Sequence, residues 1–150
     1  MPFEMPPLVD HSYAIEMQVQ ECIEEASHKY NVPHLLLRAI RIKEAGTVGK
    51  VTRMSGKKSY DIGPMQINTI WLETLAGHGI SEEELTNNPC ANAHVGAWVL
   101  RGYFDHHNDW FKATQSYNAG YRIKNGLLYA TDVFSKWSLL YQSTLVATTN

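Results

Sequence analysis

The chain has 150 residues, a formal net charge of −2, 44% hydrophobic residues and 19% charged residues. This length and composition predict one folded domain with its own core, rather than a disordered or repeat protein. The weak negative charge and the single Lys/Arg doublet, Lys57-Lys58, exclude a broad basic surface for nucleic acid. No apolar run approaches the ~20 residues that a membrane span needs.

The first part of the chain is predicted to form an arm and two helices. Three prolines disfavour a helix over 1–11, so a flexible arm is expected there. The arm lacks the apolar core of a signal peptide, so the protein is either cytosolic or its sequence begins after a removed signal. Ser12 can cap a helix whose apolar residues, beginning with Ile15, recur at helical spacing as far as Tyr30.

The second helix, from about His34 to Ala45, carries an acidic residue on its apolar face. Leu36, Ile40 and Glu44 are spaced i, i+4, i+8, so the Glu44 carboxyl is expected at the edge of the core. Desolvation there raises the pKa of a carboxyl group. The alternative is a solvated Glu at a frayed helix end, although a negative charge is unfavourable at a helix C-terminus.

A turn-rich stretch from 46 to 68 brings a second carboxylate. Residues 51–54 and 59–62 are predicted to pair as two short strands of an irregular hairpin. Asp61 lies in the second of these strands, directly before a compact run from Gly63 to Asn68. Asp61 is either a turn-capping residue or a charged partner for Glu44.

The middle of the chain is predicted to be helical. Two short helices are expected near 69–76 and 82–87, the second with a capping box that begins at Ser81. Asn88-Pro89 then starts the longest apolar helix, which runs to about His106. Because this helix is apolar around most of its circumference, it is expected at the centre of the core.

Two more helices complete the predicted fold. Asp109 can cap a helix through about Tyr117, and a last helix spans about 127–142. A flexible tail is expected over 143–150. The chain is therefore predicted to be a single α+β domain over 1–150, predominantly α-helical, with a small β-hairpin.

Two cysteines and seven histidines bear on other chemistries. Cys22 falls on the apolar stripe of the first helix, and Cys90 falls in the first turn of the longest one. They are either two buried thiols or a disulfide that closes a long loop, and a disulfide would indicate an oxidising compartment. The histidines do not have the spacing of a metal-binding motif, so neither a metal nor a cofactor is expected.

Glu44 and Asp61 suit the cleavage of a glycosidic bond. That reaction needs a protonated carboxylic acid beside the leaving oxygen and, usually, a negative group facing the cationic centre. The acid must be partly desolvated to stay protonated near neutral pH, while its partner stays solvated and charged. A helix-end Glu and an Asp on a hairpin fit these roles, but a pair of carboxylates alone is not specific.

A set of short motifs makes the interpretation more specific. The first three are Glu44, Gly63-Pro64-Met65-Gln66-Ile67-Asn68 and Ser116-Tyr117-Asn118-Ala119-Gly120. Three more are Cys22, Asn88-Pro89-Cys90 and Val95-Gly96-Ala97-Trp98. In this order they resemble the goose-type, lysozyme-like lytic transglycosylases, and in particular the small peptidoglycan-cleaving enzymes of type III and type IV secretion systems and conjugation machines. The resemblance spans about Cys22 to Trp137 and implies a lysozyme-like fold with the hairpin beside the cleft.

The resemblance implies a reaction and an acid to perform it. Glu44 matches the family's general acid, which protonates the leaving oxygen of the β-1,4 bond between N-acetylmuramic acid and N-acetylglucosamine. The same carboxylate then deprotonates the muramic 6-hydroxyl, whose attack gives a 1,6-anhydro product. Met65 and Gln66 match the segment that lines the saccharide groove.

Three further roles follow from the resemblance. Tyr117 and Asn118 match a segment whose polar groups position sugar next to the acid. Tyr129, four residues before Val133, matches a tyrosine that faces the site. Cys22 and Cys90 match a cysteine pair that is expected to form a disulfide in this subgroup.

The sequence also departs from the family pattern. Ala45 follows the acid where the family often has Ser, and Pro64 stands where it often has Leu. Many members have no carboxylate at the position of Asp61, which can stabilise the cation, act as a nucleophile or tune Glu44. A hydrolytic muramidase that uses Asp61 is therefore the alternative function. A non-catalytic wall-binding assembly protein is a lesser alternative, because Glu44, Gln66 and Asn118 are all retained.

The resemblance also sets expectations for partners and location. Glycan strands of peptidoglycan are the expected substrate, and secretion-system components are candidate partners. We expect a monomer without a membrane span or a nucleic-acid partner. The expected location is the periplasm or outside the cell, with a signal peptide missing from this sequence.

Overall fold

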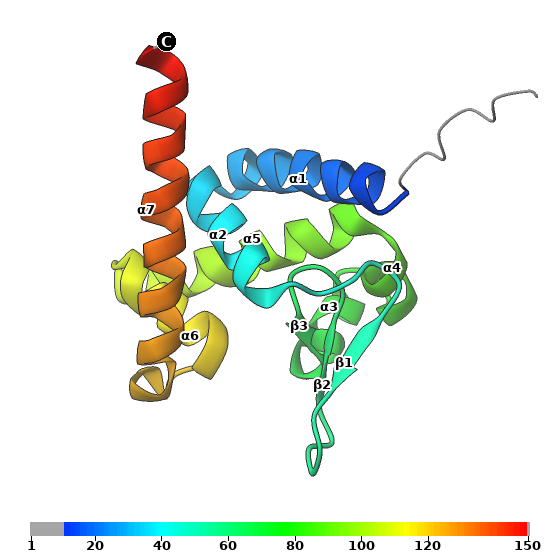
Figure 1. Cartoon of the computed structure of the whole chain (residues 1–150). Coiled ribbons are helices and arrows are strands. Elements are labelled where there is room, and N and C mark those ends of the chain that lie inside the picture. Colours follow the sequence, from blue (N-terminus) through cyan, green and yellow to red (C-terminus); the bar gives the residue numbers. More distant parts are fainter. Residues whose placement is uncertain (1–10, 150) are drawn as a thin grey trace, which may run out of the picture.

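The computed structural model describes residues 11–149, and helices dominate within them (Figure 1). The long helices are α1 (His11–Tyr30), α2 (His34–Glu44), α5 (Pro89–His107), α6 (Trp110–Ala119) and α7 (Leu127–Thr149). The short helices are α3 (Leu72–Gly77) and α4 (Glu82–Asn87), with 3₁₀ segments η1 (Thr69–Trp71) and η2 (Ile123–Gly126). The strands are β1 (Val51–Arg53), β2 (Tyr60–Ile62) and β3 (Ile67–Asn68). The predominantly helical α+β class is confirmed.

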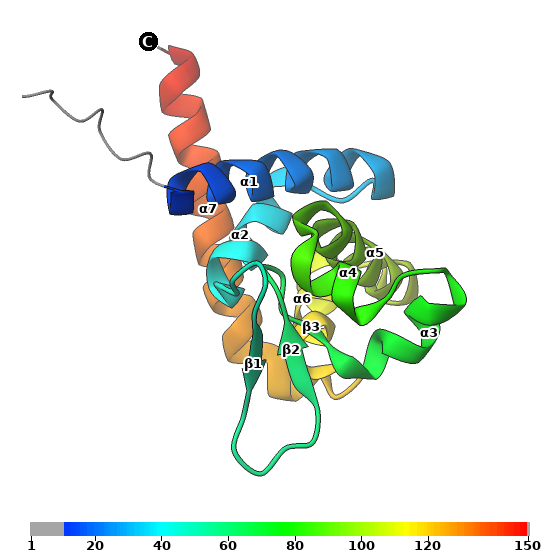
Figure 2. The same cartoon turned by 90° about the vertical axis from the view of Figure 1, so that its right-hand side faces the viewer.

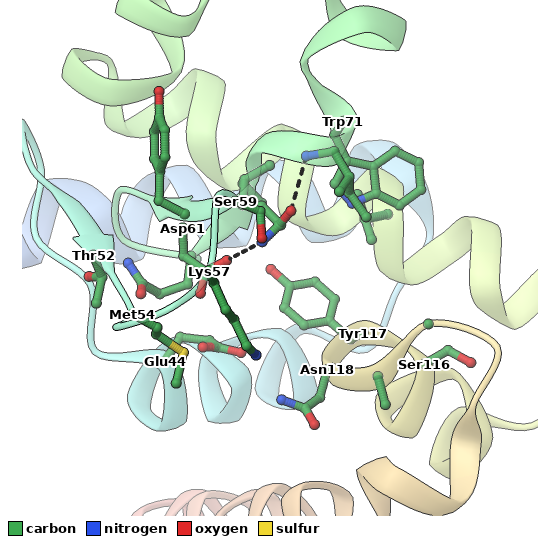
Figure 3. A pocket seen from close by; sticks show the side chains of 18 of the residues that line it. Glu44, Thr52, Met54, Lys57, Ser59, Asp61, Trp71, Ser116, Tyr117 and Asn118 are labelled. Carbon is green, nitrogen blue, oxygen red and sulfur yellow. Dashed lines mark hydrogen bonds between the residues drawn. The ribbon is translucent and has the colours of Figure 1, made fainter.

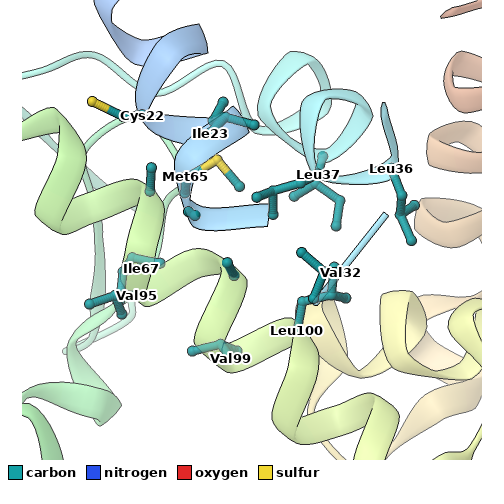
Figure 4. Close-up of a cluster of buried hydrophobic side chains, with 14 of the residues drawn as sticks. Cys22, Ile23, Val32, Leu36, Leu37, Met65, Ile67, Val95, Val99 and Leu100 are labelled. Carbon is teal, nitrogen blue, oxygen red and sulfur yellow. The ribbon is translucent and has the colours of Figure 1, made fainter. Parts of the chain in front are cut away.

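Helix α5 lies at the centre, as its apolar sequence predicts. It packs against α1 and α6, while α2 packs against α7 (Figures 1 and 2). The buried side chains of α5 meet those of α1 and α2 in one cluster, which includes Leu37, Val99 and Leu100 (Figure 4). Small residues let neighbours approach: a Cβ added at Gly96 would meet the Met65 side chain at 3.1 Å. The core therefore forms around α5 and fixes the elements that carry the cleft.

Side-chain caps start three of the helices where the sequence predicts them. Ser81 accepts a hydrogen bond from the backbone N–H of Glu84 at 3.1 Å, at the start of α4. Asn88 accepts from two backbone N–H groups at the start of α5, and Asp109 accepts from that of Lys112 at the start of α6. Each cap satisfies backbone donors that have no partner inside the helix.

The hairpin is confirmed, but the sheet has a third strand that was not predicted. Strand β2 pairs antiparallel with β1 and also with β3. Asp61 is thereby aligned with Thr52 on one side and with Asn68 on the other. Since side chains alternate between the faces of a sheet, these three lie on one face. Strand β3 has only two residues, too few to show a period in the sequence.

Three predictions for the helices are wrong. Ser12 does not cap the first helix, because it lies within α1, which begins at His11. The last helix does not end near 142, because α7 continues to Thr149 through the segment where a flexible tail was predicted. Hydroxyl groups there bond back to backbone carbonyls one turn earlier, as Ser143 does to Leu139. Ile15, predicted on the buried stripe of α1, is 44% exposed. The predicted arm lies outside the described residues, apart from His11, which begins α1.

A disulfide joins Cys22 of α1 to Cys90 at the start of α5. It closes a loop across a sequence separation of 68 residues and so ties together the two ends of the hairpin-bearing half of the chain. Among the described residues, no helix is both long and apolar enough to cross a lipid bilayer.

Candidate active site

A cleft of about 400 Å³ lies between the sheet and the end of α6 (Figure 3). Four residues singled out from the sequence line it together with Glu44: Asp61, Gln66, Tyr117 and Asn118. They come from α2, β2, the turn after β2, and α6. Segments far apart in the chain thus meet at one site, with the sheet on one side and the end of α6 on the other.

Glu44 is held at the end of α2 by a sharp change in backbone direction. The next residue, Ala45, has a left-handed conformation with φ 53°, and its N–H bonds to the Arg41 carbonyl at 2.9 Å. The Arg41 guanidinium donates to the carbonyls of Gly46, at 2.7 Å, and Pro64, at 3.1 Å. The segment after the acid is therefore tied to the turn that follows β2.

The environment of Glu44 favours its protonated form. Burial raises the pKa of its carboxyl to about 7, and the nearby negative charge of Asp61 contributes in the same direction. A hydrogen bond from Tyr129 and the charge of Lys43 act in the opposite direction. The carboxyl also stands at the negative end of the α2 dipole, which further disfavours ionisation. Glu44 can therefore carry a proton near neutral pH and still release it.

Tyr129 lies behind Glu44 and orients its carboxyl. The Tyr129 hydroxyl donates to Glu44 Oε1 at 2.6 Å, across 85 residues of sequence. The tyrosine is only 9% exposed, and burial raises its pKa well above the usual range, so it stays a neutral donor. Because Oε1 accepts this bond, the acidic proton of Glu44 belongs on Oε2. Tyr129 is not among the residues that line the cleft.

Asp61 faces the same cleft from β2. Its Oδ1 accepts a hydrogen bond from Asn68 Nδ2 at 3.0 Å, which joins neighbouring positions of β2 and β3. Asn68 is anchored in turn, because its own Oδ1 caps η1 by accepting from the backbone N–H of Ile70. The two carboxylates thus differ in setting, with one sheltered by burial and one on the solvated face of the sheet.

The turn after β2 separates Met65 from Gln66. Gln66 lines the cleft, where its Nε2 donates to the Gly63 carbonyl at 3.0 Å. The sequence places Met65 on the groove wall as well, but its side chain is 0% exposed and packs in the core (Figure 4). Both Gly63 and Gln66 have positive φ, 69° and 53°. This backbone path sends the two neighbouring side chains to opposite sides.

Tyr117 and Asn118 close the other side of the cleft. The Tyr117 hydroxyl donates to the Met65 carbonyl at 2.8 Å, so it connects α6 with the turn after β2. Asn118 lies one residue further, near the end of α6, and its side chain is exposed in the cleft. Tyr117 therefore links α6 to the turn across the cleft floor, and the Asn118 amide is free to bind a ligand.

Comparison with known proteins places this cleft in a family. The family model described as "Transglycosylase SLT domain" matches residues 21–137. The chain belongs to the transglycosylase SLT domain family. It is 33% identical over 120 residues to Protein IpgF of Shigella flexneri, covering 78% of this chain and 79% of that protein. The predicted resemblance and the lysozyme-like fold are thereby confirmed.

Two other relatives have a similar identity over a smaller share of the chain. The X polypeptide of Escherichia coli K12 is 33% identical over 119 residues, which cover 76% of this chain and 70% of that protein. Invasion protein IagB of Salmonella typhimurium is 32% identical over 100 residues, which cover 67% and 62%. In each case the similarity extends over about two thirds or more of the SLT domain chain.

Two residues that shape this SLT domain were missed in the sequence. Asn92 is fully buried in α5 and accepts from the Met65 N–H at 2.8 Å. Its Nδ2 donates to the carbonyls of Ile62, at 2.9 Å, and Leu85, at 3.1 Å, so it fixes the turn after β2. The second residue is Arg41, which donates to the carbonyls of Gly46 and Pro64. A polar amide between two alanines in the apolar α5 is the one signal that points to Asn92.

Replacing Tyr129 with Phe is expected to raise the pKa of Glu44 above 7. The phenol donates to the ionised carboxylate and stabilises it, so its removal favours the protonated form by about one pH unit. A ¹³C NMR titration of the Glu44 carboxyl measures this directly, without reference to turnover. Tyr141→Phe, at an exposed position of the same helix, is the control. An unchanged or lower pKa in Tyr129→Phe would contradict the assigned contact.

Proposed function

We propose that the protein is a peptidoglycan lytic transglycosylase that cleaves the β-1,4 bond between N-acetylmuramic acid and N-acetylglucosamine. The observation that carries the proposal is the Glu44 carboxyl at the end of α2, where burial raises its pKa to about 7. It lines a cleft with the amide and hydroxyl groups of Gln66, Tyr117 and Asn118, in a chain of the SLT family. An acid of this pKa is matched to catalysis near neutral pH.

The proposed reaction needs one group that first donates and then accepts a proton. Glu44 Oε2 protonates the glycosidic oxygen, and the bond from that oxygen to the muramic C1 breaks. The Glu44 carboxylate then takes the proton of the muramic 6-hydroxyl, and O6 bonds to C1. The products are two strands: one begins with a sugar that has a free 4-hydroxyl, and the other ends in a 1,6-anhydro muramic residue. Glu44 regains its proton in the same step, so no water is consumed.

Asp61 supports a second candidate function, that of a hydrolytic muramidase. A charged carboxylate facing the cationic centre stabilises it, which suits either reaction. It also supports hydrolysis, in which water rather than O6 attacks C1. Asp61 lines the cleft, and its charge reaches Glu44 strongly enough to contribute to the raised pKa. The two functions share the acid and differ only in the attacking oxygen.

Product analysis separates the two functions. We expect digestion of purified sacculi to release muropeptides with 1,6-anhydro ends, each lighter by one water than its reducing counterpart. Asp61→Asn is expected to slow release by about 10²-fold, because the cationic centre loses its counter-charge. Mass spectrometry after chromatography measures both. Reducing ends without anhydro products would replace the first function with the second. Failure to digest sacculi at all would favour the non-catalytic wall-binding role.

We further propose that the enzyme opens the cell wall locally for a secretion apparatus, in the periplasm or after export. One relative, IagB of Salmonella typhimurium, is named as an invasion protein, which supports such a role. The disulfide between Cys22 and Cys90 favours an oxidising compartment. Cell fractionation followed by thiol labelling tests the location, and two free thiols in the fractionated protein would oppose it.

A further inference from the structure

The cleft contains a single basic side chain among the described residues that line it. That side chain is Lys57, and the charged groups beside it in the lining are the carboxylates Glu44 and Asp61. Lys57 extends from the hairpin towards Glu44 and Asn118 (Figure 3). A cleft with two acidic groups repels a negatively charged ligand unless a cation compensates locally. Lys57 is in position to do so.

The position of Lys57 is fixed by the hairpin rather than by an ion pair. Its backbone N–H bonds to the Met54 carbonyl at 3.2 Å, and Gly56 between them has φ 77°, which closes the turn. The strand pair next to the loop is held by Tyr60, whose hydroxyl donates to Glu82 and whose ring lies under the Arg53 guanidinium. A supported hairpin therefore presents the lysine at the cleft.

Lys57 is not used to neutralise the acids of the protein itself. Within the described residues, no Asp or Glu oxygen lies within ion-pair distance of its ammonium group, whereas Lys43 and Lys136 both pair with Asp132. The cation that lowers the pKa of Glu44 is Lys43. Lys57 thus keeps its charge available to a ligand in the cleft.

We propose that Lys57 forms an anion subsite that binds a carboxylate of the peptide stem on the glycan strand. This inference rests on the proposed function, and it narrows the substrate class to peptide-bearing strands. In such strands the lactyl carboxylate is consumed in an amide bond, so the free carboxylates belong to the peptide. A neutral sugar polymer offers no partner for the lysine and therefore lacks this gain in affinity.

Binding of soluble glycan fragments to an inactive protein tests the subsite. In a Glu44→Gln background the fragments stay intact, and their Kd is measured by calorimetry at low salt. Adding Lys57→Gln is expected to weaken binding of peptide-bearing fragments about fivefold, as for an exposed charge pair. Lys57→Arg should restore the affinity. Lys58→Gln, at the adjacent exposed lysine outside the cleft lining, should leave it unchanged.

Three ligands identify the group that Lys57 binds. The fivefold difference should vanish when the peptide carboxylates are converted to methylamides, and also at about 0.5 M salt, where exposed charges are screened. Peptide-free fragments with free lactyl carboxylates should show no such difference. A loss that persists on the methylamide ligand, a dependence only on lactyl carboxylates, or equal effects at Lys57 and Lys58 would overturn the inference. Absence of turnover in the parent protein would instead count against the proposed function.

Discussion

Replacing Glu44 with Gln is expected to lower the rate of sacculus digestion by about 10³-fold. The substitution keeps the shape of the side chain and still lets its oxygen accept from Tyr129, but it removes the transferable proton. General acid catalysis contributes roughly 10² to 10⁴-fold, and here the same group also acts as the base. Release of soluble muropeptides measures the rate. Glu73→Gln, with the same change of charge at an exposed site on α3, should digest at the parent rate.

The same variant should be more stable than the parent above pH 7. The pKa of Glu44 is about 7 in the folded protein, against an ordinary value of 4.5 for a solvated glutamate. As pH rises through this window the unfolded chain loses its proton first, so the parent loses about 3 kcal/mol of stability. Gln cannot ionise and avoids this loss. Urea unfolding at pH 5 and pH 8 measures it. A destabilised, inactive variant would indicate a structural role for Glu44 rather than that of the acid.

Local patterns in the sequence predict the features of the site that depend on neighbours in the chain. The spacing of Leu36, Ile40 and Glu44 places the acid at the edge of the core because one helix face is continuous over three turns. Asp61 is found on a strand for a similar reason, since a short alternating run precedes the turn. Such inferences need only the periods of helix and strand.

Local sequence patterns do not predict the contacts between segments that are distant in the chain. The bond from Tyr129 to Glu44 joins α7 to α2, and no local pattern encodes their packing. The resemblance indicated that Tyr129 faces the site, but not that it lies behind the acid. Likewise, Met65 and Gln66 look equivalent until the positive φ at Gln66 turns the chain. Buried Asn92 makes that turn possible from thirty residues away in sequence, through its bond to Ile62.

Removing the disulfide with a Cys22→Ala/Cys90→Ala double variant should lower the free energy of unfolding by about 4 kcal/mol. The bridge closes a loop with a sequence separation of 68 residues, and a loop of this length confers roughly that much stability by restricting the unfolded chain. Urea unfolding under oxidising and reducing conditions measures the change. Reductant should destabilise the parent by a similar amount and leave the variant unaffected.

Removal of the disulfide should change the stability of the protein but leave the cleft intact. Neither cysteine lines the cleft, so the double variant should digest sacculi at the parent rate well below its unfolding temperature. A domain of this size has only about 5–15 kcal/mol of stability in total, so loss of the bridge removes a substantial share. The folded protein is therefore expected to be most stable in a compartment that keeps Cys22 and Cys90 oxidised. Equal stability of parent and variant would remove that dependence, and with it the structural argument for export.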